Sequence, residues 1–189
     1  MSRVLVTGFS SYELEIFNDK DPKLLIIQKV IKDALKIRLE SGADWLITGA
    51  QLGVEQWAME IGVQLKTEYP DFKVAVMLPF TEFGQQWNEN NQAKLSQILA
   101  KADFTDSLSH KPYQAPQQLR AYQRFMLTHT DQAILIYDPE HPGKTKYDYD
   151  LIQKWRENHP YPLEVIDFDD LQEAADEYAE NENNSFNLD

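Results

Sequence analysis

Cysteine is absent from this chain of 189 residues. That absence excludes disulfide bonds, thiolate metal ligands and a cysteine nucleophile, and it is compatible with a reducing compartment. Histidine is also scarce, and the four histidines lack the close spacing of a zinc site; they are His110, His129, His141 and His159. We therefore expect neither a metal ion nor a cofactor.

Long hydrophobic runs are missing as well. No apolar stretch approaches the roughly 20 residues that span a bilayer, and the N-terminal segment lacks the pattern of a signal peptide. The chain is nevertheless 42% hydrophobic, which suffices for one substantial core. We expect a cytoplasmic protein without a membrane span.

Positive charge is in short supply. The 18 Lys and Arg residues face 31 Asp and Glu residues, for a formal net charge of -13. Much of this excess belongs to the C-terminal segment, because 169–189 contains eight acidic side chains and no Lys or Arg. No basic face for nucleic acid is evident in the remainder, so nucleic acid is disfavoured as a partner.

The apolar residues that are present alternate between strand and helix periodicity. Short apolar runs predict strands at 3–8, 45–49, 73–80, 133–137 and 163–168, with a weaker strand near Phe104. Helical spacing predicts helices at 22–39, 54–65, 119–130 and 149–158, and around Leu95 to Leu99. Continuous apolar strands must be covered on both faces. We therefore expect an α/β, Rossmann-like fold, with a doubly wound, mostly parallel sheet and helices on both faces.

The domain organisation follows from the same patterns. No internal repeat and no linker divides the chain, so we expect a single Rossmann-like domain over 1–180. Residues 181–189 are acidic and polar and lack the apolar content that would offset the entropy of ordering. We expect this segment to be a flexible tail.

Glycine is sparse, with seven residues, so a pair of glycines at one strand end stands out. The segment Gly49-Ala50-Gln51-Leu52-Gly53-Val54-Glu55 follows a predicted strand and begins a predicted helix. Its glycines permit close backbone approach, and a helix start suits a phosphate or carboxylate. Glu55 lies off the apolar stripe of the helix and is expected to face the ligand crevice. Alternatively, Glu55 only complements the helix dipole and the glycines only form a tight turn.

Other candidate contacts belong to neighbouring strand ends, where open parallel sheets bind ligands. The loop at Gly8 lacks the G-x-G-x-x-G fingerprint, which argues against an ordinary NAD site. The loop from Asp138 to Lys144 is either a lid over a phosphorylated ligand or a surface turn. The full set of candidate ligand-binding residues is Gly8, Phe9, Ser10, Gly49, Gln51, Gly53, Glu55, Pro79, Trp87, Arg120, Arg124, Asp138 and Lys144.

Three of these candidates also have an ordinary structural explanation. Arg120 and Arg124 are spaced to project from one helix face as an anion clamp, although solvated surface arginines are the commoner outcome. Trp87 is able to stack on a base, although core packing is the commoner role of a tryptophan.

Three segments together resemble the bacterial YpsA family. They are Val4-Leu5-Val6-Thr7-Gly8, Ile47-Thr48-Gly49-Ala50-Gln51-Leu52-Gly53-Val54-Glu55-Gln56-Trp57 and Ala133-Ile134-Leu135-Ile136-Tyr137-Asp138, and the likeness covers nearly the whole chain. The family looks like a branch of the SLOG superfamily, which includes the LOG phosphoribohydrolases and the DNA-processing protein DprA. Their shared Rossmann-like fold binds nucleotides or related ligands, so the resemblance implies a nucleotide-type pocket.

The resemblance also implies particular site residues. The Gly49–Glu55 turn is similar to the superfamily's glycine-rich turn, and Gln123-Arg124-Phe125-Met126 is similar to the arginine-bearing helix of LOG enzymes. Gly49, Gly53, Glu55 and Arg124 therefore carry over. The LOG motif P-G-G-x-G-T-x-x-E is not reproduced in 138–148, which lacks the double glycine and the catalytic glutamate.

These observations support three hypotheses. The first is a binding or sensor protein for a nucleotide or nucleotide-derived small molecule, which acts through a regulatory protein partner and is compatible with an oligomer. The second is a nucleoside-monophosphate phosphoribohydrolase with Arg124 on the phosphate and Glu55, Asp138 or Asp148 near the ribose, because N-glycosidic cleavage needs a carboxylate there. The third, single-stranded DNA binding, is disfavoured by the acidic balance.

Overall fold

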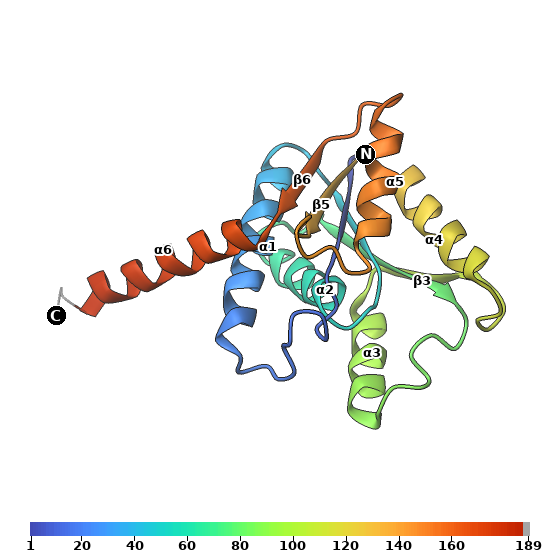
Figure 1. Cartoon of the computed structure of the whole chain (residues 1–189), viewed down its shortest axis with the longest axis horizontal. Coiled ribbons are helices and arrows are strands. Elements are labelled where there is room, and N and C mark those ends of the chain that lie inside the picture. Colours follow the sequence, from blue (N-terminus) through green and yellow to red (C-terminus); the bar gives the residue numbers. More distant parts are fainter. Residues whose placement is uncertain (187–189) are drawn as a thin grey trace.

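A computed structural model describes residues 1–186, in which strands and helices alternate along the chain (Figure 1). The strands are β1 (Arg3–Gly8), β2 (Trp45–Thr48), β3 (Lys73–Phe80), β4 (Phe104–Ser109), β5 (Gln132–Ile136) and β6 (Leu163–Ile166). The helices are α1 (Pro22–Glu40), α2 (Val54–Leu65), α3 (Glu89–Lys101), α4 (Pro116–Thr128), α5 (Lys146–Arg156) and α6 (Phe168–Phe186).

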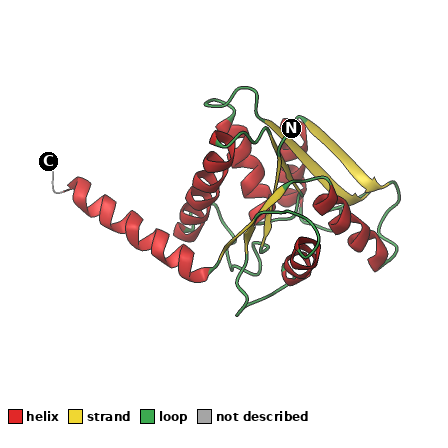
Figure 2. Ribbon diagram, turned by 90° about the horizontal axis from the view of Figure 1, so that it is seen from above, coloured by secondary structure: helices red, strands yellow, loops and turns green. Residues whose placement is uncertain are grey.

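The six strands form one parallel sheet in the order β4-β3-β2-β1-β5-β6. The chain builds outward from β1 to β4 and then returns to place β5 on the other side of β1, where Gly8 is in register with Ile136. Helices α1 to α3 contact one another in sequence, and α4 contacts α5. Helices consequently cover both faces of the sheet (Figure 2). The α/β, Rossmann-like, doubly wound fold predicted from the sequence is confirmed, and the sheet is parallel throughout.

The core lies where the central strands meet α1 and α2. Val4, Val6, Leu46 and Ile134 are fully enclosed, as expected for strands covered on both sides. Helix α1 begins at Pro22, where the side chain of Asp21 accepts a hydrogen bond from the Lys23 N–H at 2.9 Å. The apolar residues at helical spacing in α1 that are buried include Leu24, Ile27, Ile31 and Leu35.

Strand β4 is longer than its sequence pattern suggests. It pairs only with β3, at the edge of the sheet, and its first three residues are exposed. An edge strand is covered less completely than a central one, so it does not need a continuous apolar run. This explains why periodicity gave only a weak signal near Phe104.

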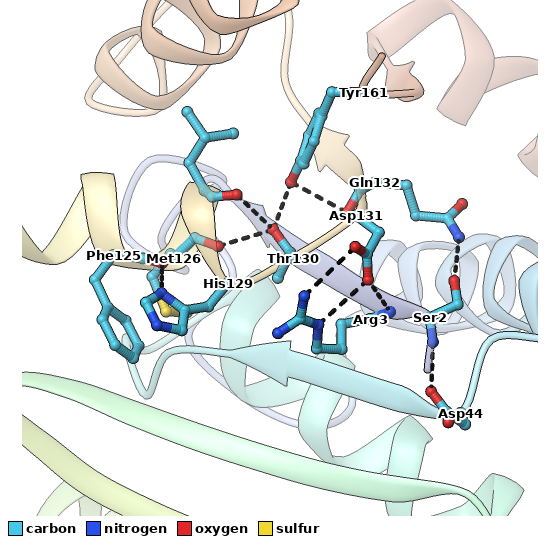
Figure 3. Close-up of polar contacts among 11 residues, drawn as sticks. Ser2, Arg3, Asp44, Phe125, Met126, His129, Thr130, Asp131, Gln132 and Tyr161 are labelled. Atoms are coloured by element: carbon cyan, nitrogen blue, oxygen red, sulfur yellow. Dashed lines mark hydrogen bonds and ion pairs between the residues drawn. The ribbon is translucent and has the colours of Figure 1, made fainter. Parts of the chain in front are cut away.

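At the amino-terminal edge of the sheet, polar side chains form hydrogen bonds with one another and with nearby backbone groups (Figure 3). Asp131 accepts hydrogen bonds from the Arg3 backbone N–H at 2.8 Å and from Arg3 Nε at 3.3 Å. The hydroxyls of Thr130 and Tyr161 lie 2.6 Å apart, and the Tyr161 hydroxyl donates to the Gln132 carbonyl at 3.2 Å. Burial raises the pKa of Tyr161. These groups satisfy one another, whereas the opposite, carboxyl edge is the one at which open parallel sheets bind ligands.

Helix α6 projects from the body of the protein (Figures 1 and 2). It passes the boundary expected at residue 180 and continues to Phe186, with residues 181–186 all exposed. The rest of the expected tail, 187–189, lies outside the described residues. Within 1–186, no helix has both the length and the apolar content needed to cross a membrane.

Candidate functional site

The glycine turn between β2 and α2 packs directly on the loop that follows β1. Gly53 has φ +119°, a conformation that favours glycine, and a Cβ there would lie 2.4 Å from the Ser11 nitrogen. The Val54 N–H donates to the Phe9 carbonyl at 3.1 Å, and the Ser11 N–H donates to the Leu52 carbonyl at 2.9 Å. The close approach that Gly53 permits is therefore made to protein backbone.

Gly49 has a different role, because it makes room for Glu55. A Cβ at Gly49 would lie 2.3 Å from Glu55 Oε2 and 2.5 Å from the Tyr122 hydroxyl. Glu55 Oε1 accepts a hydrogen bond from the Thr7 hydroxyl at 3.0 Å, and Oε2 accepts one from the Gln51 N–H at 2.8 Å. The glycine thus lets the carboxyl group of Glu55 lie at the end of β1, beside α4.

Glu55 lines a pocket between β1, α4 and α5, which we call the acidic pocket. The pocket encloses about 310 Å³, its open mouth included. The polar lining side chains come from four elements; they are Thr7, Glu55, Tyr122, Gln123 and Asp148. The remaining lining residues are apolar, so the pocket contains no Lys, Arg or His. Only about 20 Å³ of this space is available to the centre of a water-sized group, so the pocket admits one polar group of a ligand rather than a whole nucleotide.

The pKa values of the two carboxyl groups in this pocket are raised. Burial raises the pKa of Asp148 to about 7, and the charge of Glu55 contributes to the increase. Burial also raises the pKa of Glu55, while the hydrogen bonds from Gln51 and Thr7 oppose that increase. Both side chains reach solvent through the mouth but lie deep among protein atoms. Acids that interact in this way titrate as a pair.

Helix α4 supplies the hydrogen-bonding groups around the pair. The Gln123 amide Nε2 donates to Asp148 Oδ1 at 3.1 Å, and the Tyr122 hydroxyl donates to the Met77 carbonyl at 3.0 Å. Burial and the nearby charge of Glu55 hold the pKa of Tyr122 well above its usual value. The pocket can therefore accept hydrogen bonds through the carboxyl groups and retain a proton near neutral pH.

Sequence reasoning missed Thr7, Tyr122 and Gln123. Helical periodicity contained part of the signal, because Tyr122, Gln123, Met126 and Leu127 share one face of α4 and all line the pocket. Asp148 was only one of three candidate carboxylates. Its position in Thr145-Lys146-Tyr147-Asp148 matches the T-x-x-E end of the LOG motif, with Asp in place of Glu.

Asp138, a predicted site residue, has both carboxylate oxygens in hydrogen bonds with backbone N–H groups. Its Oδ1 accepts the Glu140 N–H at 2.8 Å, and its Oδ2 accepts the Phe168 N–H at the start of α6 at 3.2 Å. Burial acts to raise the pKa of Asp138, but these backbone hydrogen bonds outweigh it and the pKa is lowered. Phe9 is also buried, with its ring 5.4 Å from that of Phe168. Neither residue lines the acidic pocket.

The other predicted contacts are dispersed. Arg120, Arg124, Lys144 and Gln51 are exposed, and none of them lines the acidic pocket. Pro79 is buried within β3, and Trp87 packs edge-on against Phe83. The remaining two lie at and just after the end of β1: Gly8 pairs with Ile136 of β5, and the Ser10 N–H donates to Glu13 Oε2 at 2.8 Å. The structure thus brings Gly49 and Glu55 together, but it does not gather all predicted contacts in one pocket.

Glu13 joins two of the predicted loops. Its Oε2 accepts the Ser10 N–H, and its Oε1 accepts the Lys144 N–H at 2.9 Å. A Cβ at Gly143, where φ is +48°, would lie 2.4 Å from Glu13 Oε1. The loop after β5 is therefore held against the loop after β1 at the carboxyl edge of the sheet.

Comparison with known proteins identifies the family. Residues 4–171 match the sequence model YpsA, described as the YspA SLOG family. A UPF0398 protein of Lactiplantibacillus plantarum is 57% identical over 188 residues, which cover 100% of both chains. UPF0398 proteins of Levilactobacillus brevis and Lactobacillus gasseri are 56% and 55% identical, with 97% and 98% of this chain covered and 97% and 100% of theirs. The resemblance inferred from the sequence motifs is thereby confirmed, and the chain belongs to the YpsA family of SLOG proteins.

Proposed function

We propose that the protein binds a nucleotide or nucleotide-derived small molecule in the cytoplasm, with a hydroxyl-bearing part of the ligand at Glu55 and Asp148. The supporting observation is that these two carboxyl groups share a pocket without a cation. Such an arrangement destabilises a fold when the acids ionise, and groups of this kind gather at functional sites. A ribose carries hydroxyl groups, and these can donate hydrogen bonds to carboxylate oxygens.

The phosphate of such a ligand lies outside the acidic pocket in this proposal, because no cationic side chain lines it. The loop before Asp148 offers the complementary charge. Lys144 is exposed there, and the amino-terminal end of α5 begins at Lys146. A helix start attracts anions through its free N–H groups and its dipole. In a sensor of this kind, a regulatory partner protein would distinguish the bound from the free state.

A second candidate function is N-glycosidic hydrolysis of a nucleoside monophosphate. The observation that favours it is the pKa of about 7 at Asp148, beside a second carboxyl group. General acids work best when their pKa lies near the operating pH, and glycosidic cleavage uses a pair of carboxyl groups. Glu55 and Asp148 would form this pair, and Asp138 would not belong to it. Release of free base from a nucleoside monophosphate would distinguish the enzyme from the binding protein.

The experiment is a ligand titration of the full chain with nucleoside monophosphates, nucleoside diphosphates and dinucleotides, followed by thermal unfolding. A ligand at about 100 times its Kd stabilises the protein by about 2.7 kcal/mol. We expect Glu55→Gln and Asp148→Asn to weaken binding at least tenfold. Asp150→Asn is the matched control, because Asp150 lies on the same helix but is exposed and pairs with Lys146. The proposal fails if no nucleotide stabilises the protein, or if the two site variants bind as well as the control.

A further inference from the structure

Helix α6 leaves the body of the protein soon after it begins (Figures 1 and 2). Its start contacts α1, and Leu171 is the last apolar residue of α6, within the described chain, that packs against the core. The helix then continues to Phe186, which is about four further turns, and none of its residues is buried. Most of α6 therefore presents a face that no other element of residues 1–186 covers.

The uncovered face of α6 is acidic. The helix carries seven Asp and Glu residues and no Lys or Arg. Four of these acids follow one another at intervals of four, three and four residues, which places them along one side of the helix; they are Asp169, Glu173, Asp176 and Glu180. Like charges at this spacing repel one another, and a helix without a packed face is only marginally stable in water. A positively charged surface against this face would relieve the repulsion.

No such surface is supplied by the same copy of the chain. Among the ion pairs of residues 1–186, none includes an acidic side chain of α6. The start of α6 lies beside α1, but the rest of the helix leads away from the body (Figure 1). The acids of α6 are therefore free to contact another molecule.

The outward face of α1 has a matching arrangement of opposite charge. Leu25, Lys29, Lys32 and Lys36 follow one another at the same intervals of four, three and four residues. They lie on the side of α1 opposite the buried Ile31, and Leu25 is 48% exposed. The whole helix carries five basic and two acidic side chains, so α1 is basic where α6 is acidic.

The lysines of this face can accept a further partner. Lys29 pairs with Asp33 at 2.7 Å and Lys36 pairs with Glu68 at 2.6 Å, and each of these four side chains is at least 31% exposed. Exposed pairs of this kind contribute little free energy. Lys32 forms no ion pair within the described residues. Each ammonium group has three N–H donors, so it can bind a second carboxylate.

We propose that α6 docks on the outward face of α1 in a second copy of this chain, forming a two-fold symmetric dimer. Glu173, Asp176 and Glu180 would lie against the three lysines of the second copy. Both triplets are spaced by three and then four residues, and both span about 10 Å along their helices. Two-fold symmetry lets each copy provide one α6 and receive one, so the contact is made twice. This proposal does not rest on nucleotide binding.

The test is sedimentation equilibrium of the full chain at about 0.15 M salt. The Debye length is then about 8 Å, which screens the repulsion between two acidic chains but preserves attraction between charges in contact. We expect a reversible dimer. Glu173→Lys with Asp176→Lys should weaken self-association at least about tenfold, because like charges then face each other. Lys29→Glu with Lys32→Glu should have the same effect.

A mixture of these two charge-reversed variants is the decisive measurement. The reversed α6 of one variant complements the reversed α1 of the other, and the two unchanged surfaces complement each other as well. The mixture should therefore form a heterodimer, although neither variant dimerises alone. The matched control is Asp150→Lys with Glu157→Lys, which makes the same charge change at exposed positions on and just after α5. This control should dimerise at least as strongly as the wild type.

The wild-type chain provides a test that needs no folded variant. At about 1 M salt the Debye length falls to about 3 Å, so the dimer should dissociate. A dimer equally stable at both salt concentrations would overturn the proposal, as would a wild-type chain that stays monomeric at about 0.15 M salt. The proposal is also wrong if the mixture of reversed variants does not associate, or if the α5 control loses the dimer as they do.

Discussion

Glu55 and Asp148 occupy the first turns of α2 and α5, the helices that follow the two strands flanking β1. Their carboxyl groups meet in one pocket at the end of β1, where Thr7 donates to Glu55. An acid in a first helical turn is ordinarily a surface residue that complements the helix dipole. Here the same placement, repeated on both sides of the central strand, creates a pair of partly buried acids.

This pair predicts an unusual pH dependence of stability. An unfolded Asp has a pKa of about 3.9, whereas the pKa of Asp148 in the folded protein is about 7. Between these values the folded state binds more protons than the unfolded state, so the free energy of unfolding should fall as the pH rises from about 4 to about 7. Asp148→Asn should reduce this decline and gain about 1–3 kcal/mol relative to wild type at pH 8. Urea denaturation across this pH range measures the effect.

The control for the pH prediction is Asp150→Asn. Asp150 is exposed and lies on the same helix, so its replacement should preserve the wild-type slope. If Asp148→Asn shows the same slope as Asp150→Asn, Asp148 does not retain its proton in the folded protein.

Gly49→Ala should disrupt the site through steric overlap. The added Cβ would lie 2.3 Å from Glu55 Oε2 and 2.5 Å from the Tyr122 hydroxyl, so at least one of these side chains must move. We expect a loss of about 1–3 kcal/mol in the free energy of unfolding, together with weaker nucleotide binding. Gln51→Ala changes an exposed side chain in the same turn and should cost less than about 0.5 kcal/mol. Equal stability of the two variants would contradict the packing described here.

Tyr161→Phe should destabilise the amino-terminal edge of the sheet. The substitution removes the hydroxyl that lies 2.6 Å from Thr130 Oγ1 and donates to the Gln132 carbonyl. Loss of the donor to this partly buried carbonyl should cost about 1 kcal/mol, which chemical denaturation resolves. Tyr12→Phe provides the comparison, because Tyr12 is 78% exposed and should tolerate the change. Similar midpoints for the two variants would argue against a stabilising role of the Tyr161 hydroxyl.

Truncation after Glu180 should leave the fold intact. Residues 181–186 are exposed throughout, so their removal takes away little buried surface and should cost less than about 0.5 kcal/mol. Thermal unfolding of the truncated chain should remain cooperative, with a midpoint close to that of the full chain. A broad transition would show that the end of α6 is structural.

Local sequence patterns determined the fold class and the position of the glycine turn. The apolar period changes from strand to helix along the chain, and such patterns depend on neighbours only a few residues apart. The same local information placed Gly49 and Glu55 at the start of a helix after a strand. Periodicity was weakest at β4, whose exposed edge position is a property of the whole sheet.

Only the tertiary structure decided which residues share a pocket. The return of the chain to place β5 beside β1 brings Asp148 to Glu55, and it turns Gln123 rather than Arg124 toward them. Asp138 carries the same functional group as Asp148, but one of its oxygens accepts a hydrogen bond from the Phe168 N–H at the start of α6. Sequence spacing cannot distinguish these two carboxylates, because their burial and hydrogen-bonding partners come from segments far apart in the chain.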